Sequence, residues 1–170
     1  GMHSDLFDRV VLPLRHKLFR FAFMLVNSRP EAEDIVQDAM MKLWIKKNDL
    51  SKIGNIEAWS MTITRNLAHD HLRKRKSRSS SGLLPEEIKT LAATEGTSLE
   101  FNEKLNHVHR CIDLLPGKQK QAVFLRDIEG HSYKEISDIM GIDENLVKVT
   151  LFRARDNLRK RILKIENYGL

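Results

Sequence analysis

Apolar residues recur at helical spacing along most of the chain. The spacing of three to four residues predicts α-helices over 4–27, 30–48, 55–76, 101–114, 117–129, 132–140 and 143–165. Signals for β-strands are weak, because no Asn-Gly or Asp-Gly turn lies between alternating apolar runs. The sequence therefore predicts an all-α protein.

One segment between these helices differs in composition. Residues 77–100, SRSSSGLLPEEIKTLAATEGTSLE, are rich in Ser, Gly, Thr and Glu and show little periodicity. This composition predicts a flexible linker with one short helical turn near Pro85. We therefore expect two small helical domains, over 3–76 and 101–168, joined by a linker over 77–100.

Composition adds an expectation about partners and setting. The chain has 29 Lys and Arg against 23 Asp and Glu, and its net charge of +6 favours an anionic partner. The single cysteine, Cys111, allows no intramolecular disulfide, and no stretch resembles a leader peptide or a membrane span. We therefore expect a cytoplasmic protein without direct membrane insertion.

The C-terminal half carries signals for two helices joined by a tight turn. Ser132 and Glu135 have the spacing of a capping box, which predicts a helix start. Gly141 can adopt the left-handed conformation that ends this helix, and Asp143 is a suitable N-cap for the next one. The short turn between them predicts a helix-turn-helix.

The second of these helices has two contrasting faces. Its inward stripe should consist of Val147, Leu151, Ala154, Leu158 and Ile162. On the opposite side, Val149 and Phe152 lie beside Arg153, where apolar groups could contact thymine methyls while Arg binds guanine. DNA binding is therefore expected, although both apolar residues could instead cover a neighbouring domain or be incidental. Phosphates are the expected contacts of Lys148, Arg155, Arg159 and Arg161.

The predicted helix over 30–48 also has two faces. Its apolar side is formed by Ile35, Val36, Ala39, Met40, Leu43 and Trp44, and its other side by Asp34, Gln37, Asp38, Met41 and Ile45. An acidic patch edged by apolar residues suits a protein partner better than nucleic acid. The alternative is a solvated helix face.

The predicted helix over 55–76 begins near Asn55 and should bury Trp59, Ile63 and Leu67. It ends in a run of cations, Arg73, Lys74, Arg75, Lys76 and Arg78. Crowded like charges repel unless an anion is near, so this run is expected to bind phosphate. A solvated entrance to the linker is the alternative.

Three stretches together resemble a known family. Their order and residues strongly resemble the bacterial sigma-70 family, in its extracytoplasmic-function (ECF) branch. The stretches are, in this order, EAEDIVQDAMMKLW, EAWSMTITRNLAHDHLRKRK and LPGKQKQAVFLRDIEGHSYKEISDIMGIDENLVKVTLFRARDNLR. The likeness covers nearly the whole chain except the linker and the termini. It implies a dissociable subunit that directs RNA polymerase to promoters and is itself neither an enzyme nor a cofactor protein.

The resemblance also implies roles for particular residues. The acidic face should dock on a coiled coil of the beta-prime subunit through Asp34, Gln37, Asp38 and Met41. The third helix should bind the minus-ten element, with Asn66 holding a flipped base, through Arg65, Asn66, Asp70, Arg73, Lys74 and Arg75. The minus-thirty-five element should be read by Lys148, Val149, Phe152, Arg153 and Arg155.

Departures from the family pattern affect the last of these sites. Many members have Ser and Arg in succession where this chain has Val149 and Thr150, and Thr where it has Leu146. The missing cation at Thr150 should weaken a phosphate contact, and Val149 should shift base preference toward a thymine methyl. Expected partners are the beta-prime and beta subunits of core polymerase, promoter DNA and an anti-sigma factor, and the free chain is expected to be monomeric.

Other chemistry is not expected. His107 and Cys111 lie one helical turn apart, but two ligands do not make a metal site, so a buried Cys111 with surface histidines is the expectation. His69, Asp70 and His71 diverge around a helix, by about 100° per residue, and do not form a catalytic cluster. The competing readings are a dimeric helix-turn-helix regulator and a helical scaffold with a cationic surface.

Overall fold

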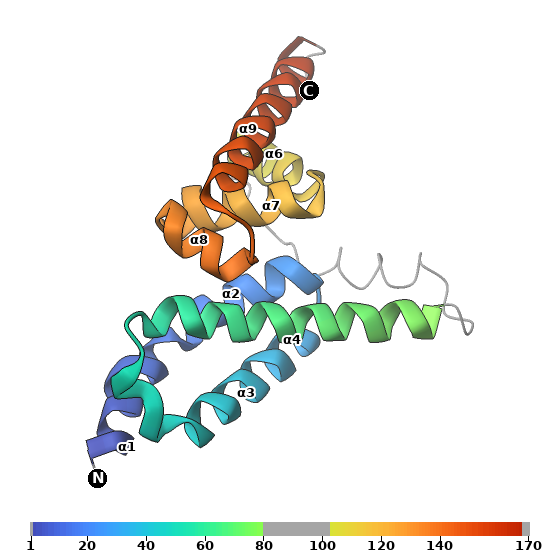
Figure 1. Cartoon of the computed structure of the whole chain (residues 1–170). Helices are drawn as coiled ribbons and strands as arrows, with labels where there is room; N and C mark the ends of the chain where they lie inside the picture. The colour runs from blue at the N-terminus through green and yellow to red at the C-terminus, as the bar shows by residue number, and fades with distance from the viewer. Residues whose placement is uncertain (1, 80–102, 168–170) are drawn as a thin grey trace. The chain divides into compact units, whose positions relative to one another are not determined.

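The chain forms two helical units. The computed structural model describes residues 2–79 and 103–167, and these fall into two compact units (Figure 1). Within these ranges no residue lies in a strand, so the predicted all-α fold is confirmed. The turn expected near Pro85 and most of the expected linker lie outside the described residues, so the boundaries 3–76, 77–100 and 101–168 stay predictions.

The first unit opens with a helix that is interrupted. α1 (Met2–Leu6) leads into a π-helical turn (Phe7–Val11) and a 3-10 turn (Leu12–Leu14) before α2 (Arg15–Val26) begins. The prediction of one continuous helix over 4–27 was therefore wrong. Pro13 gives the reason, because it lacks an N–H and its ring clashes with the carbonyl four residues earlier.

Three helices make the body of this unit. α3 (Arg29–Ile45), a 3-10 turn (Lys47–Lys52) and α4 (Ile56–Ser79) follow α2, and α2, α3 and α4 pack against one another (Figure 1). Local capping sets the starts of α3 and α4. The Ser28 hydroxyl accepts from the Glu31 N–H, and Asn55 Oδ1 lies 2.9 Å from the Ala58 nitrogen.

The buried face of α4 differs from the expected one. Trp59, Ile63 and Leu67 are only half-buried, and the face that meets α2 and α3 consists of Ala58, Ser60, Met61, Thr64 and Ala68. Small side chains allow close helix packing. The hydroxyls of Ser60 and Thr64 donate to backbone carbonyls one turn earlier, at 2.7 and 2.9 Å, so their burial leaves no donor unsatisfied.

Trp44 is a second departure from the expected core. Its side chain is 41% exposed although it was assigned to the buried side of its helix. It meets the Phe7 ring edge-on, with centroids 5.1 Å apart, and the Lys47 ammonium lies 3.7 Å from the centre of the Trp44 ring. Trp44 therefore closes the margin of the core instead of filling its centre.

The second unit packs three shorter helices on a long one. α6 (Glu103–Asp113), α7 (Gly117–Val123) and α8 (Tyr133–Met140) each contact α9 (Glu144–Asn167), and a π-helical turn (Phe124–Ile128) follows α7 (Figure 1). The continuous helix expected over 117–129 is thus only partly α-helical. Cys111 is buried within α6, while His107 is half-exposed and His109 is exposed, as expected.

The predicted helix-turn-helix is confirmed in detail. Ser132 and Glu135 form a complete capping box at the start of α8, and Gly141 ends the helix at φ 68°. Asp143 Oδ1 then accepts from the Leu146 N–H at 2.7 Å, and α9 begins. From the predicted inward stripe, Val147, Leu151 and Ala154 are fully buried, and Leu158 and Ile162 are half-buried.

Candidate functional site

One candidate surface lies on α3. Asp34, Gln37 and Asp38 are all exposed, and Met41 and Ile45 beside them are 65% and 73% exposed. Neither carboxylate forms an ion pair with any residue in the described ranges. A folded protein rarely leaves adjacent large apolar side chains so open, and this mixture of free carboxylates and apolar groups can serve protein association.

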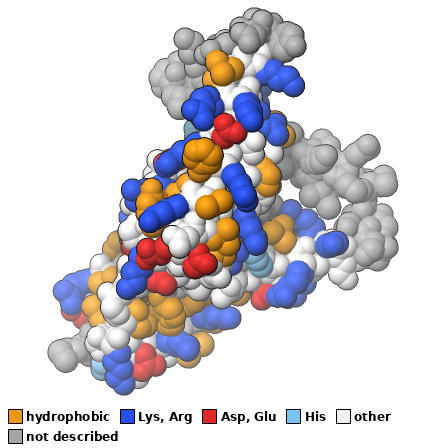
Figure 2. Space-filling view, turned by 45° about the horizontal axis from the view of Figure 1, so that its top comes forward, with side chains coloured by type: hydrophobic (Ala, Val, Ile, Leu, Met, Phe, Trp, Pro, Cys, Tyr) orange, Lys and Arg blue, Asp and Glu red, His pale blue; other side chains and the backbone are white. Residues whose placement is uncertain are grey.

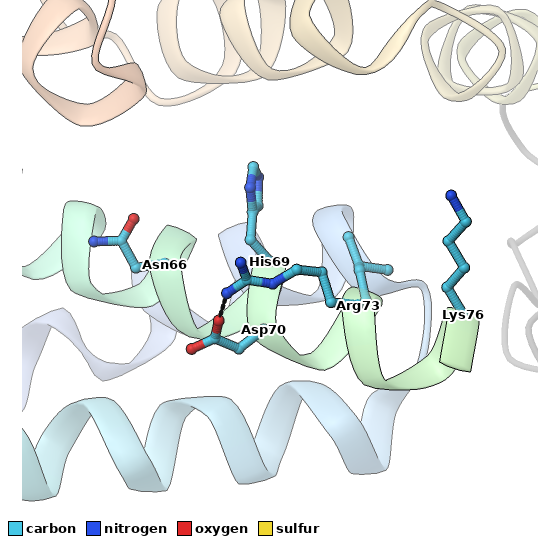
Figure 3. A pocket seen from close by; sticks show the side chains of 6 residues that line it. Asn66, His69, Asp70, Arg73 and Lys76 are labelled. Carbon is cyan, nitrogen blue, oxygen red and sulfur yellow. Dashed lines mark hydrogen bonds and ion pairs between the residues drawn. The ribbon is translucent and has the colours of Figure 1, made fainter. Parts of the chain in front are cut away.

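A second candidate surface is an open pocket along α4. Its volume is about 480 Å³, and its lining consists of Asn66, His69, Asp70, Leu72, Arg73 and Lys76. The side chains of Asn66, His69 and Lys76 project to the same side of the helix (Figure 3). They recur at three- and seven-residue spacing, which aligns them on one helical face.

Charge inside this pocket is arranged unevenly. Arg73 forms an ion pair with Asp70, so one cation and one carboxylate neutralise each other at the pocket wall (Figure 3). The pKa of His69 is lowered, first by burial and then by the positive charges of Arg65 and Arg73. This favours the neutral form of the ring, which can act as both a hydrogen-bond donor and an acceptor.

The cationic end of α4 does not form one exposed cluster as predicted. The Arg75 guanidinium donates to the Val26 carbonyl at 2.8 Å and pairs with the Glu31 carboxylate, and burial lowers its pKa. Lys74 is exposed but lies outside the pocket lining, as does half-buried Arg65. The anion that offsets the crowded charge at Arg75 is therefore the protein's own Glu31.

The third candidate surface is the outward face of α9. Phe152 is 71% exposed, and Val149 beside it is also exposed, as predicted from the sequence. Lys148 and Arg153 are exposed on the same helix, and Arg153 has no ion-pair partner among the described residues. An apolar pair next to a free guanidinium matches the chemistry of major-groove edges.

Tyr133 joins α8 to this surface. An open pocket of about 490 Å³ is lined by Tyr133, Lys148, Leu151, Phe152, Arg155 and Arg159. The Tyr133 ring lies 4.6 Å from the Arg126 guanidinium and 5.8 Å from the Lys148 ammonium, measured to the ring centroid. Tyr133, at the start of α8, therefore lies near one cation of the π-helical turn after α7 and one cation in the first turns of α9.

On α9, Arg155 has a partner within the protein, and Thr150 is buried. Arg155 Nη2 lies 2.8 Å from Asp127 Oδ1, and this hydrogen bond raises the pKa of Arg155. Thr150 is 8% exposed. Its side chain therefore faces the core of the unit, and the expectation that the missing cation at this position weakens a phosphate contact stays a prediction. Figure 2 shows Lys and Arg side chains interleaved with hydrophobic ones on the visible face of α9.

Comparison with known proteins identifies the family of this chain. Residues 10–78 match the family described as Sigma-70 region 2, and residues 105–158 match that described as Sigma-70, region 4. The protein named ECF RNA polymerase sigma factor EcfG, from Rhodopseudomonas palustris, is 31% identical over 140 residues, which cover 81% of this chain and 75% of that protein. The chain belongs to the sigma-70 family. It is an ECF-type sigma factor, as its sequence motifs indicated.

Two further relatives show the same likeness. The protein named ECF RNA polymerase sigma factor SigE, from Mycolicibacterium smegmatis, is 29% identical over 164 residues, and this chain spans 62% of its length. The solved structure of the sigma factor RpoE with the anti-sigma factor NepR, from Bartonella quintana, superposes with a TM-score of 0.73 at 28% identity. That match covers 94% of this chain and 97% of RpoE.

In this sigma factor His69 and Lys76, which the sequence analysis named but did not group with Asn66, share the α4 pocket with it. They lie three and ten residues after Asn66, on the same face of the helix. The structure also adds Tyr133, which the sequence analysis left out. Tyr133 follows the Ser132 cap directly, but its place beside Lys148 depends on how α8 packs on α9. None of the described helices is both long and apolar enough to span a membrane.

Proposed function

We propose that this sigma factor binds core RNA polymerase, recognises both elements of its promoters and promotes their melting. The observation that supports the proposal is that α3, α4 and α9 each present a surface of different chemistry. One is acidic and apolar, one is a polar pocket flanked by cations, and one pairs exposed apolar groups with a free arginine. Family membership supports reading all three together.

Core polymerase would dock on α3 through Asp34, Gln37, Asp38 and Met41. The free carboxylates supply attraction for a basic partner, and Met41 adds apolar area that is desolvated on binding. We assign the beta-prime subunit as the partner of this face because the motif EAEDIVQDAMMKLW resembles the docking motif of the family. The linker and the C-terminal unit would add contacts with the beta subunit.

The minus-ten element would be bound along α4. Asn66 would hold a base that has left the non-template strand, because its amide offers a donor and an acceptor to the pairing edge of a base. Asp70 would border this polar edge while it stays paired with Arg73, and Lys74 and Lys76 would meet phosphates. Arg75 is left out of this proposal, because its guanidinium is held by Glu31 and Val26. Capture of the open strand pulls the duplex equilibrium toward melting without ATP hydrolysis.

The minus-thirty-five element would be read as duplex by α9. Val149 and Phe152 would contact thymine methyls, Arg153 would bind a base edge, and Lys148 would hold a phosphate. Arg155 forms an ion pair with Asp127, so we propose that it lies next to the phosphate backbone and helps to position α9 on the DNA. An anti-sigma factor is a further proposed partner, supported by the solved complex of RpoE with NepR.

Transcription in vitro tests the proposal. Core polymerase with this chain should transcribe from a promoter that the holoenzyme selects from a randomised library. Arg153→Ala should cost about 1–3 kcal/mol of binding at the upstream element and relax its sequence preference. Arg161→Ala, which removes an exposed arginine farther along α9, is the matched control and should weaken binding evenly across sequences. Equal transcription from intact and scrambled upstream elements would overturn the assignment of α9.

A further inference from the structure

An aspartate from outside α9 holds one of the arginines on the outward face of that helix. Arg155 Nη2 lies 2.8 Å from Asp127 Oδ1, and Arg155 Nε lies 3.4 Å from Asp127 Oδ2. Both carboxylate oxygens therefore meet one edge of the guanidinium, a geometry that fixes its plane as well as its position. Asp127 belongs to the π-helical turn after α7, so the ion pair joins two elements of the second unit.

The π-helical turn gives Asp127 a fixed backbone. Phe124 and Leu125, just before it, are buried in the core of the unit. Their carbonyls accept from the Glu129 N–H at 3.0 Å and the His131 N–H at 2.9 Å, so the turn is also closed by backbone hydrogen bonds. Asp127 therefore presents its carboxylate from a well-anchored position.

The ion pair itself lies in contact with water. The side chains of Arg155 and Asp127 are 48% and 41% exposed. Pairs as exposed as this one add little to stability, because water and salt screen their charges. The main consequence of the pair is therefore for the charge that α9 presents to a ligand.

Positive charge on this face is largely compensated. The open pocket on α9 contains three cations, Lys148, Arg155 and Arg159, and two of them have a carboxylate partner. Attraction to the phosphate backbone depends on net positive charge and does not distinguish one sequence from another. Each carboxylate beside these cations therefore lowers the affinity for duplex DNA of any sequence.

We propose that Asp127 is a specificity-determining residue, which cancels the charge of Arg155 toward DNA of the wrong sequence and holds its guanidinium in place for the right one. This inference rests on the proposed reading of the minus-thirty-five element by α9 and deepens it. Specificity is a difference of two affinities, so weaker non-specific binding raises it.

At the correct site the same pair costs less affinity. Arg155 Nη1 makes no hydrogen bond with Asp127 and is left for a phosphate oxygen. A guanidinium that is already held in place loses less freedom when it binds. At an incorrect site this fixed direction does not fit the backbone, and the carboxylate repels the phosphates.

The first test measures non-specific binding by the full chain alone. The probe is a fluorescently labelled duplex that carries a scrambled upstream element. Asp127→Asn keeps the shape of the side chain and removes its charge, so it should bind the probe several-fold more tightly, with the slope of log Kd against log salt steeper by about one. Asp138→Asn is the matched control, an exposed aspartate on α8 that forms no ion pair with the described residues. It should change the affinity much less, because it releases no arginine.

The second test measures specificity in the holoenzyme. Asp127→Asn should lower the ratio of transcription from intact and scrambled upstream elements several-fold, and Asp127→Glu, which keeps a carboxylate, should retain most of the ratio. In an Arg155→Ala background, Asp127→Asn should no longer tighten binding of the scrambled duplex. The urea midpoint of Asp127→Asn should match that of the unmodified chain, because the exposed pair adds little stability.

Three outcomes would overturn the inference. One is equal binding of the scrambled duplex by Asp127→Asn and the unmodified chain. Another is an undiminished gain in the Arg155→Ala background, since Asp127 would then only repel DNA. The third is a clearly lower urea midpoint, which would make Asp127 a residue of the fold.

Failure of the proposed function looks different. The reading of the upstream element by α9 stands in all three of these cases if the unmodified holoenzyme still prefers the intact element. Equal transcription from intact and scrambled elements by the unmodified holoenzyme would instead overturn the proposed function of α9, so the two failures are distinguishable.

Discussion

Arg75 Nη2 lies 2.8 Å from the carbonyl oxygen of Val26, the last residue of α2. The same guanidinium pairs with Glu31 in the first turn of α3. One side chain near the C-terminal end of α4 therefore binds the connection between the two other helices of the unit. This places Arg75 among the residues that hold the fold together.

Removing this arginine should lower stability more than DNA binding. Arg75→Ala leaves the Val26 carbonyl and the Glu31 carboxylate without their partner in a partly buried setting, which should cost about 1–3 kcal/mol of unfolding free energy. Lys74→Ala, an exposed neighbour, should cost almost nothing. Urea unfolding measures both. If Arg75→Ala kept full stability but lost promoter binding, the structural role would be wrong.

Asn66 should matter for melting and not for assembly. Asn66→Ala should reduce the permanganate reactivity of promoter thymines in the open complex, because the flipped base loses its polar partner. Its affinity for core polymerase should be unchanged, since Asn66 lies on α4 and the proposed docking face is on α3. Unchanged thymine reactivity in the variant would count against the flipped-base role.

Val149 and Phe152 should sense the thymine methyl group. Replacing thymine by uracil in the upstream element removes only that methyl, and a lost methyl contact is worth about 1 kcal/mol. The unmodified protein should therefore bind the uracil duplex several-fold more weakly at one or two positions. Val149→Ala and Phe152→Ala should each lose this discrimination at one position. Equal binding of thymine and uracil duplexes by the unmodified protein would exclude methyl readout.

His69 gives the stability a pH dependence of known sign. Its pKa in the folded chain lies below the ordinary value, so between about pH 6.5 and the lowered pKa the unfolded chain binds more protons than the folded one. Stability from this group is therefore present above about pH 6.5 and is lost as the pH falls through that range. An NMR titration of the ring measures the pKa directly. Arg73→Gln should raise it, because a nearby positive charge is removed.

Local signals predicted the helix ends well. The capping box at Ser132, the left-handed Gly141 and the cap at Asp143 each act within a few residues, so the sequence alone identified the helix-turn-helix. The outward face of α9 could be predicted equally well, because helical spacing alone puts Val149 and Phe152 opposite the buried stripe. These features depend on neighbours in sequence and not on the rest of the fold.

Features set by distant partners could not be predicted in this way. Arg75 looks like its cationic neighbours until Glu31, which is far away in sequence, is placed beside it. Trp44 looks like a core residue, but its packing depends on Phe7. The buried face of α4 was misassigned because Ser60 and Thr64 look polar, whereas their hydroxyls are satisfied within their own helix.

Co-elution with core enzyme shows whether this sigma factor acts as a subunit of RNA polymerase. Gel filtration of the chain with core RNA polymerase of its host should give one complex, and Asp38→Arg should abolish it by reversing a charge on the α3 docking face. Asp8→Arg, the same charge change at an exposed position outside that face, should co-elute normally. Absence of a complex with the unmodified chain would rule out the role as a polymerase subunit, and equal co-elution of Asp38→Arg would rule out the α3 docking face.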